Sequence, residues 1–243
     1  MITSKNKKIY LCSVERENIE QLRNWRNMPE LRKYFREYRE ISKDAQVKWY
    51  EEKVLGDKNQ VNFEIHDNES GKLIGHCGLY YVKWINRTGE FGIYIGDNDF
   101  RGKGYGKEAL ETLINYGFNN LNLLKIWAEV FGNNSAIHLY KKLGFKQEGI
   151  LRKNVYKEGE HLDSILIGLL KEEWKVPQKT EPGEKKQKTI LNELIDMLPE
   201  EGIKEAEKEL EDLVDFYKKL KNTIAGATKK ADRFIPKKRK GYY

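Results

Sequence analysis

Residues 101–106, Arg-Gly-Lys-Gly-Tyr-Gly, have the composition of an anion-binding loop. Glycines at alternate positions remove side chains, so that backbone N–H groups can converge on one anion. The pattern of an amphipathic helix follows, and the positive end of its dipole adds to the attraction. The loop therefore favours a phosphate or pyrophosphate ligand, and glycines that serve only a tight turn are the alternative.

Two common phosphate-binding loops do not match this spacing. The segment lacks the Gly-Lys-Ser/Thr ending of nucleotide triphosphatases. Its G-x-G-x-G pattern also differs from the G-x-G-x-x-G of dinucleotide folds, and no hydrophobic strand opens the chain where such a fold requires one. Neither kind of nucleotide site is indicated.

A second block lies downstream of the loop. It reads Asn-Asn-Ser-Ala at 133–136 and Leu-Tyr-Lys-Lys-Leu-Gly-Phe at 139–145. Together the two blocks resemble the GNAT superfamily of N-acetyltransferases over about residues 8–174, in particular the branch that acetylates amino-sugar nucleotides, spermidine and ribosomal-protein alanine. The resemblance implies an α/β (α+β) fold with a central mixed, mostly antiparallel sheet flanked by helices, and an acyltransferase that uses acetyl-CoA as co-substrate.

The resemblance also implies where the cofactor binds. In this family the main-chain amides of the loop hold the pyrophosphate, and the strand before the loop splays from the next strand to pair with the pantetheine arm. Asn133 faces the same arm in the family, although it could be an ordinary helix cap. The implied cofactor-binding residues are Ile93, Tyr94, Ile95, Arg101, Gly102, Lys103, Gly104, Tyr105, Gly106, Asn133 and Ser135.

Catalysis by direct attack of an amine needs a proton donor for the thiolate and a base for the amine. Tyr140 matches the family's donor, since a phenol stays protonated at neutral pH; a core tyrosine is the alternative. Glu90 is the candidate base, on the same strand face as Tyr94, but it could instead be a salt-bridge partner. His76 is a second candidate base. An acyl-enzyme through Cys77 is less favoured.

The acceptor amine is expected to contact the segment from Trp25 to Trp49. The candidate residues are Trp25, Arg26, Glu37, Tyr38 and Trp49, each of which could also be a core aromatic or a solvated charge. Basic and aromatic residues suit the diphosphate of an amino-sugar nucleotide, which is the preferred acceptor. Carboxylates in the segment leave a polyamine open, and a protein N-terminus is a third hypothesis.

Hydrophobic periodicity predicts the elements that position these residues. Strands are expected at residues 8–14, 62–66, 73–82, 88–95, 125–131, 146–152 and 163–170. Helices are expected at 15–24, at 31–38, at 43–52 with Ser42 as N-cap, after the glycine loop, and at 135–143 with Gly144 as C-terminal cap.

Composition limits the remaining classes. The 243 residues allow one catalytic domain plus an appendage. No apolar run is long enough for a membrane span, and the N-terminus lacks a signal peptide's apolar core, which predicts a cytoplasmic protein without a membrane partner. Cys12 and Cys77 are expected to be buried thiols, and the scattered histidines predict no metal site.

The chain changes character after Trp174. Residues 175–188 read as a charged, proline-containing linker, and 189–243 as a helical, hairpin-like appendage with a basic tail. Its helices could pack on the catalytic domain or on a second subunit, giving a homo-oligomer. The final Pro-Lys-Lys-Arg-Lys resembles a nuclear-import signal; it could bind nucleic acid or simply be a solvated tail. An alternative hypothesis of another class is that the whole protein is a nucleic-acid or scaffold-binding module that retains an acetyltransferase shell.

Overall fold

A computed structural model of the chain describes residues 1–4 and 8–175. The predicted appendage and basic tail, and the predicted linker apart from Lys175, lie outside the described residues. Within the described ranges, no helix is long and apolar enough to cross a membrane.

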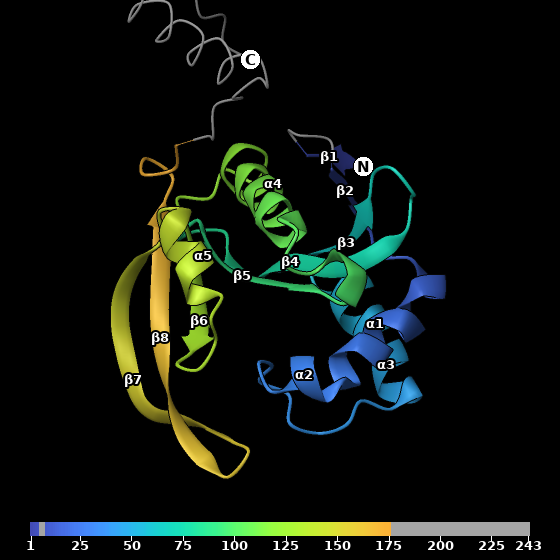
Figure 1. The fold of residues 1–243 in the computed structure, drawn as a ribbon. Coiled ribbons are helices and arrows are strands. Elements are labelled where there is room, and N and C mark those ends of the chain that lie inside the picture. Colours follow the sequence, from blue (N-terminus) through green and yellow to red (C-terminus); the bar gives the residue numbers. More distant parts are fainter. Residues whose placement is uncertain (5–7, 176–243) are drawn as a thin grey trace, which may run out of the picture. The chain divides into compact units, whose positions relative to one another are not determined.

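The described residues form one eight-stranded mixed sheet, with the strand order β1-β2-β3-β4-β5-β6-β8-β7 (Figure 1). All neighbouring strands are antiparallel except β5 and β6, which are parallel. The strands are β1 (Ile2–Thr3), β2 (Ile9–Ser13), β3 (Val61–Asp67), β4 (Leu73–Lys83), β5 (Thr88–Ile95), β6 (Lys125–Phe131), β7 (Lys146–Lys157) and β8 (Glu160–Leu170). The predicted mixed, mostly antiparallel sheet is confirmed, and β5 and β6 have the predicted bounds.

The helices lie largely where hydrophobic periodicity places them. They are α1 (Ile19–Asn27), α2 (Pro29–Arg32), α3 (Lys43–Trp49), α4 (Tyr105–Asn119) and α5 (Ile137–Lys142), with short helical turns at Arg16–Asn18, Tyr50–Leu55 and Asn98–Phe100. The predicted cap of α3 is confirmed, because the Ser42 hydroxyl accepts a hydrogen bond from the Ala45 backbone N–H at 3.1 Å.

The helix predicted at residues 31–38 is wrong beyond Arg32. Residues 33–42, here called the 33–42 loop, contain turns and bends but no helix or strand. Long-range contacts override the local helical pattern: the ring of Phe35 packs edge-on against Tyr94 at 5.3 Å, and Arg36 reaches carboxylates on two strands. Asn27 fixes the far end of the loop by hydrogen bonds of 2.9 Å to and from the backbone of Ile41.

Helices cover both faces of the central strands (Figure 1). The larger core packs α4 against the sheet through side chains such as Leu110, Leu113 and Ile126. A smaller core on the other face joins α1 to the segment from α3 to Leu55, through side chains such as Leu22 and Tyr50. Along β5, Phe91 belongs to the larger core and Tyr94 packs on the smaller one, so that the strand's alternate side chains serve opposite faces.

Strands β5 and β6 stop pairing half-way along β5. Their parallel register joins Thr88 to Lys125, Gly89 to Ile126 and Glu90 to Trp127, and ends there. On its other side β5 stays paired with β4 as far as Ile95. Beyond Glu90, therefore, every second residue of β5 directs its backbone N–H and C=O toward the space between the two strands.

Trp25 of α1 fixes the far end of β5. A Cβ built on Gly96 would lie 1.9 Å from the Cδ2 atom of the Trp25 ring. Since no side chain can occupy that space, the indole lies directly on the glycine backbone. Trp25 is only 5% exposed, and this contact sets the position of α1 against the strand that leads into the glycine loop.

We predict that Gly96→Ala destabilises the protein by about 1–3 kcal/mol, because the new methyl group must displace the Trp25 ring or the backbone. Urea unfolding of the full chain measures the effect. Gly106→Ala is the matched control, since its Cβ would meet only the Ile95 side chain at 3.5 Å. Equal stability of the two variants would contradict the packing described here.

Candidate active site

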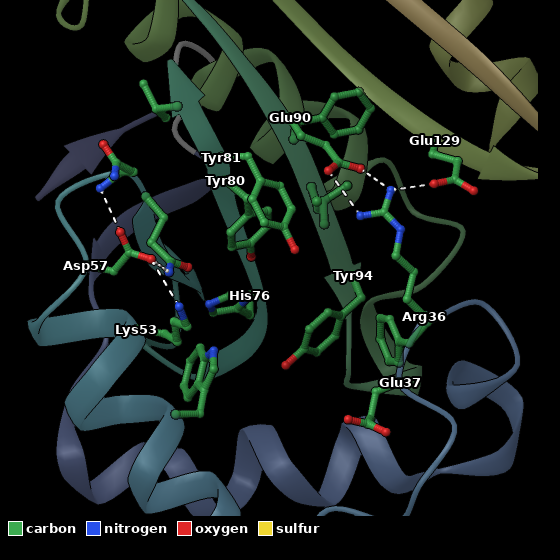
Figure 2. Close-up of a pocket in the computed structure, with 18 of the residues that line it drawn as sticks. Arg36, Glu37, Lys53, Asp57, His76, Tyr80, Tyr81, Glu90, Tyr94 and Glu129 are labelled. Atoms are coloured by element: carbon green, nitrogen blue, oxygen red, sulfur yellow. Dashed lines mark hydrogen bonds and ion pairs between the residues drawn. The ribbon is translucent and has the colours of Figure 1, made fainter. Parts of the chain in front are cut away.

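A cavity of about 1030 Å³ opens on the face of the sheet that carries the smaller core (Figure 2). Side chains from α1, the 33–42 loop, α3, β4, β5 and β6 line it. It reaches the point where β5 and β6 diverge, because Glu90 and Gly92 of one strand and Glu129 of the other are among its lining residues.

Aromatic rings form much of the cavity wall. The imidazole of His76 lies between the ring of Trp49, at 5.8 Å, and that of Tyr94, at 5.7 Å. Phe35 of the 33–42 loop extends the row by packing on Tyr94. These rings leave an apolar surface suited to a hydrocarbon chain, with polar groups only at particular points.

Tyr80 lies flat across two neighbouring strands. Gly78 of β4 pairs with Gly92 of β5, and a Cβ on either glycine would come within 2.9 Å of the Tyr80 ring or its hydroxyl. The two glycines therefore make room for the ring, in agreement with the tendency of strand glycines to mark a close approach. Burial raises the pKa of Tyr80, and its hydroxyl stays protonated at neutral pH.

Carboxylates also line the cavity, and each has a basic partner. Asp57 accepts from Lys53 at 3.3 Å. Glu37 accepts from Arg39 at 3.0 Å, and this hydrogen bond is the main cause that lowers the pKa of Glu37 to about 2. Glu90 and Glu129 are the remaining two, and they share one partner.

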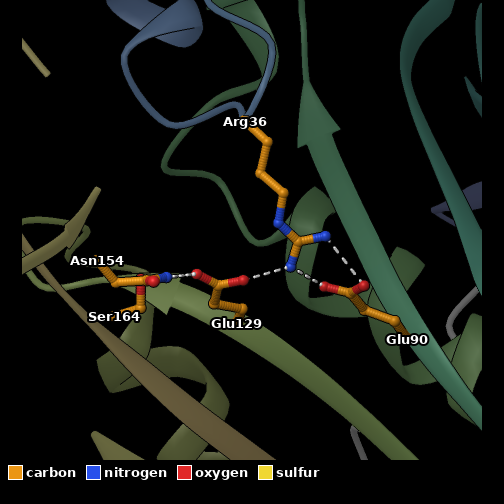
Figure 3. Close-up of polar contacts among 5 residues, drawn as sticks. All are labelled: Arg36, Glu90, Glu129, Asn154 and Ser164. Carbon is orange, nitrogen blue, oxygen red and sulfur yellow. Dashed lines mark hydrogen bonds and ion pairs between the residues drawn. The ribbon is translucent and has the colours of Figure 1, made fainter. Parts of the chain in front are cut away.

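Arg36 bridges Glu90 and Glu129 across the divergence of β5 and β6 (Figure 3). Its Nη1 and Nη2 atoms donate to the two carboxylate oxygens of Glu90, at 3.0 and 2.5 Å, and Nη2 donates to Glu129 at 2.8 Å. Asn154 of β7 donates to the other oxygen of Glu129 at 2.9 Å and to Ser164 at 3.1 Å. Burial lowers the pKa of Arg36, but the two carboxylates more than offset this effect and raise it overall.

Only part of the predicted acceptor set lines the cavity. Arg26, Glu37 and Trp49 do so. Trp25 does not, because it is buried in the smaller core against Gly96. Tyr38 is also absent from the lining: its side chain is 73% exposed, and its backbone carbonyl accepts a hydrogen bond from Arg32.

The glycine loop leads from β5 into α4 with open backbone. Gly102 and Gly104 have φ values of 72° and 88°, a left-handed conformation that favours glycine, and a Cβ at either position would meet no atom within 4 Å. The Arg101 guanidinium donates to the carbonyls of Ile95 and Gly96 at 2.8 Å, which ties the loop to the end of β5. No side chain caps the N-terminus of α4, and its first amides remain available to an anion.

The second block lies beside the same divergence. Asn133 and Ser135 are exposed just after β6, whereas the side chain of Asn134 accepts from the Ala136 amide at 3.0 Å. Tyr140 of α5 packs edge-on against Phe91, at 5.1 Å, the first residue of β5 beyond its pairing with β6. Burial raises the pKa of Tyr140 to about 12, and its hydroxyl is not part of the cavity lining described above.

The second candidate base, His76, lines the cavity but is only 5% exposed. Burial, and secondarily the charge of Arg26, lowers the pKa of His76 to about 3. Cys77 points to the opposite, larger core, where burial raises the pKa of its thiol. Both cysteines are free, and Cys12 is only half-buried rather than fully buried as predicted.

One cluster outside the cavity combines residue types that can bind a metal. Among the described residues, Cys12, Glu64 and His66 place ligand atoms within 4.8 Å of one another, which the scattered histidines did not suggest. The fully buried Glu64 accepts hydrogen bonds from the Glu15 amide and the Asn18 side chain at 2.9 Å, and it contacts His66 at 2.8 Å. These contacts account for a buried carboxylate without an ion.

Sequence reasoning did not single out Glu129, Asn154 or Tyr80, and it counted Arg36 only among the basic residues that favour a diphosphate. The glycines at 78 and 92, inside predicted strands, were an available signal for the Tyr80 ring. Arg36 fell in a predicted helix, where nothing indicated a carboxylate partner. Glu129 meets Asn154 only through the pairing of β6, β7 and β8.

Comparison with known proteins identifies the family. Residues 8–146 match the model of the acetyltransferase (GNAT) domain. The chain is 30% identical to spermidine N(1)-acetyltransferase of Vibrio cholerae over 159 residues, which cover 65% of this chain and 90% of the relative. It is 38% identical to p20, an uncharacterised N-acetyltransferase of Bacillus licheniformis, over 46% of this chain and 63% of the relative, less than two thirds of that protein's length.

A solved structure agrees with these matches. The spermidine N-acetyltransferase from Vibrio cholerae in complex with CoA and spermine superposes with a TM-score of 0.64 at 29% identity, covering 68% of this chain and 97% of that one. The comparisons give no support to a nucleic-acid partner. On its sequence, its sheet and the order of its two motif blocks, the chain belongs to the GNAT family of acetyl-CoA-dependent N-acetyltransferases.

Proposed function

We propose that the acceptor of the acetyl group is a polyamine of the spermidine type. The observation that carries this proposal is the acidic pair, Glu90 and Glu129, at the end of an aromatic cavity where β5 and β6 diverge. Carboxylates bind ammonium groups, and the rings of Trp49 and Tyr94 suit the methylene chain that joins the ammonium groups of a polyamine. Relatives named spermidine N-acetyltransferases support the same acceptor.

The amino-sugar nucleotide expected from the sequence has less support. That expectation relied on basic residues for a diphosphate, yet Arg36 and Lys53 in the cavity are each paired with carboxylates. Arg39 is likewise paired with Glu37. Arg26 and Lys83 also line the cavity, but its four cations are balanced by four carboxylates, so the cavity offers a diphosphate little net attraction. A protein N-terminus remains an acceptor for the experiment to examine.

Acetyl-CoA supplies the acetyl group as an activated thioester, and the residues present suit its binding. The proposed cradle is the glycine loop, where Gly102 and Gly104 expose backbone at the uncapped start of α4. The segment 93–95, whose alternate backbone groups face the space between β5 and β6, and the exposed Asn133 and Ser135 complete the proposed set.

Tyr140 is the proposed proton donor to the departing thiolate. Its pKa of about 12 keeps the phenol protonated at neutral pH, and its contact with Phe91 sets it beside the divergence of β5 and β6. Burial alone would also suit a core tyrosine, and a conservative variant distinguishes the two roles.

Glu90 is the proposed acceptor of the amine proton, directly or through water. It lines the cavity and is the last residue of β5 that pairs with β6. His76 is a poor base by comparison, because an imidazole with a pKa of about 3 holds a proton too weakly at neutral pH. The proposed assembly through the C-terminal helices concerns residues outside the described ranges.

We expect the kcat/KM for spermidine to be at least about a hundredfold higher than that for an amino-sugar nucleotide or an N-terminal peptide. The reason is that spermidine makes two or more charge-assisted contacts with the site that the other two amines do not make. Release of free CoA from acetyl-CoA measures turnover with each amine. A higher kcat/KM for the amino-sugar nucleotide would reverse the choice of acceptor.

Tyr140→Phe should lower kcat by about a hundredfold or more, the usual contribution of a positioned acid, with little change in the KM for acetyl-CoA. Tyr156→Phe, at a residue that is 63% exposed on β7, is the control and should keep full activity. A Tyr140→Phe enzyme with full activity would leave Tyr140 as a core residue.

The pH profile of kcat/KM distinguishes the two candidate bases. Because the pKa of His76 lies near 3, the imidazole is neutral at every pH above about 4, and His76→Gln should leave the acidic limb in place. A limb near the ordinary histidine pKa of about 6.5 that disappears in His76→Gln would make His76 the base. His138→Gln, at an exposed residue, controls for loss of a histidine as such.

A further inference from the structure

The acidic pair of the cavity already holds a cation. Glu90 and Glu129 lie on β5 and β6, with side chains only 6% and 14% exposed, and their carboxylates converge on the guanidinium of Arg36 (Figure 3). Two carboxylates this close and this buried repel each other, so that the pair is stable only with a positive charge between them.

The two sides of this contact differ in how firmly they are held. Glu90 is fixed by a strand paired with its neighbours, and Glu129 by β6 and by the hydrogen bond from Asn154. Arg36 instead belongs to the 33–42 loop, which has no regular helix or strand, and its side chain is 47% exposed. The carboxylates are thus the fixed part of the site and the guanidinium is the exchangeable part.

The position of the contact gives it a role in acceptor binding. The pair flanks the point where β5 and β6 stop pairing, which is where the proposed reaction brings amine and thioester together. While Arg36 donates to both carboxylate oxygens of Glu90, the guanidinium occupies the side of that carboxylate that an incoming amine would approach.

We propose that Arg36 is a resident cation of the acceptor site, and that a cationic amine binds by displacing it from Glu90 and Glu129. This inference rests on the proposed function. Arg36 then sets both the affinity and the charge selectivity of the site: only an acceptor that brings positive charge of its own compensates the two carboxylates. Its displacement also releases Glu90 for proton transfer, so that the base becomes available when the acceptor is bound.

Two other roles make the opposite prediction. If Arg36 stays in place and only holds the 33–42 loop over the cavity, its removal loosens the site and raises KM. If Arg36 binds a carboxylate or phosphate of the acceptor, its removal also raises KM. If Arg36 instead competes with the acceptor for the two carboxylates, its removal lowers KM.

Steady-state kinetics of the full chain with spermidine, putrescine and butylamine test the proposal. Arg36→Met keeps the length of the side chain and removes its charge, and we expect KM to fall at least about tenfold for each amine with kcat within about threefold, since each displaces the same group. Arg36→Lys, which keeps the charge, should stay close to wild type. Arg16→Met is the matched control, because Arg16 makes an exposed pair with Glu51 and does not line the cavity.

A measurement on the wild-type protein covers the case in which Arg36→Met fails to fold. The ¹⁵N NMR signal of the Arg36 side chain, identified by its absence in Arg36→Lys, should move toward that of a solvated arginine on saturation with spermidine. A signal unchanged at saturation, or a KM that is equal or higher in Arg36→Met, overturns the inference and leaves the proposed function intact. A wild-type enzyme that neither binds nor acetylates these amines overturns both.

Discussion

The site depends on one interruption in the sheet, the loss of pairing between β5 and β6 beyond Glu90 and Trp127. An unbroken parallel pair would satisfy the inner backbone groups of both strands and leave no room for a cofactor arm between them. Because β4 and β8 continue to hold the outer edges, the two strands can diverge without unfolding. Tyr140 lies on one face of this divergence, against Phe91, and the acidic pair lies on the other.

The two carboxylates of the acidic pair lie where the pairing of β5 and β6 ends. Glu90 is the last residue of β5 that pairs with β6, and Glu129 lies two residues beyond its partner Trp127. A single guanidinium spans the space between the two carboxylates. Buried ions of one sign require a partner, and the protein provides it from a loop rather than from the sheet. A cation on a loop can be exchanged at less cost in structure than one on a strand, which makes the ion pair compatible with substrate binding as well as with stability.

Glycines in and after the strands determine how closely the acceptor-side elements approach the sheet. Gly96 admits the indole of Trp25, and Gly78 with Gly92 admits the ring of Tyr80. Packing at these distances allows little adjustment, because protein interiors are close to crystal density. The positions of α1 and of the Tyr80 ring are therefore fixed by the backbone at three glycines.

The sequence by itself determined the order and kind of most elements, including the bounds of β5 and β6, because alternation and caps are local properties. It also determined the family through the glycine loop and the block around Tyr140. Arg26, Glu37 and Trp49 line the cavity, and their role in acceptor binding stays a prediction. Only the tertiary structure decided that residues 33–42 form a loop, that Trp25 is a core residue and that Arg36 joins Glu90 to Glu129. Each of these depends on contacts between residues far apart in the chain, here 54 positions from Arg36 to Glu90 and 93 from Arg36 to Glu129, which local patterns do not encode.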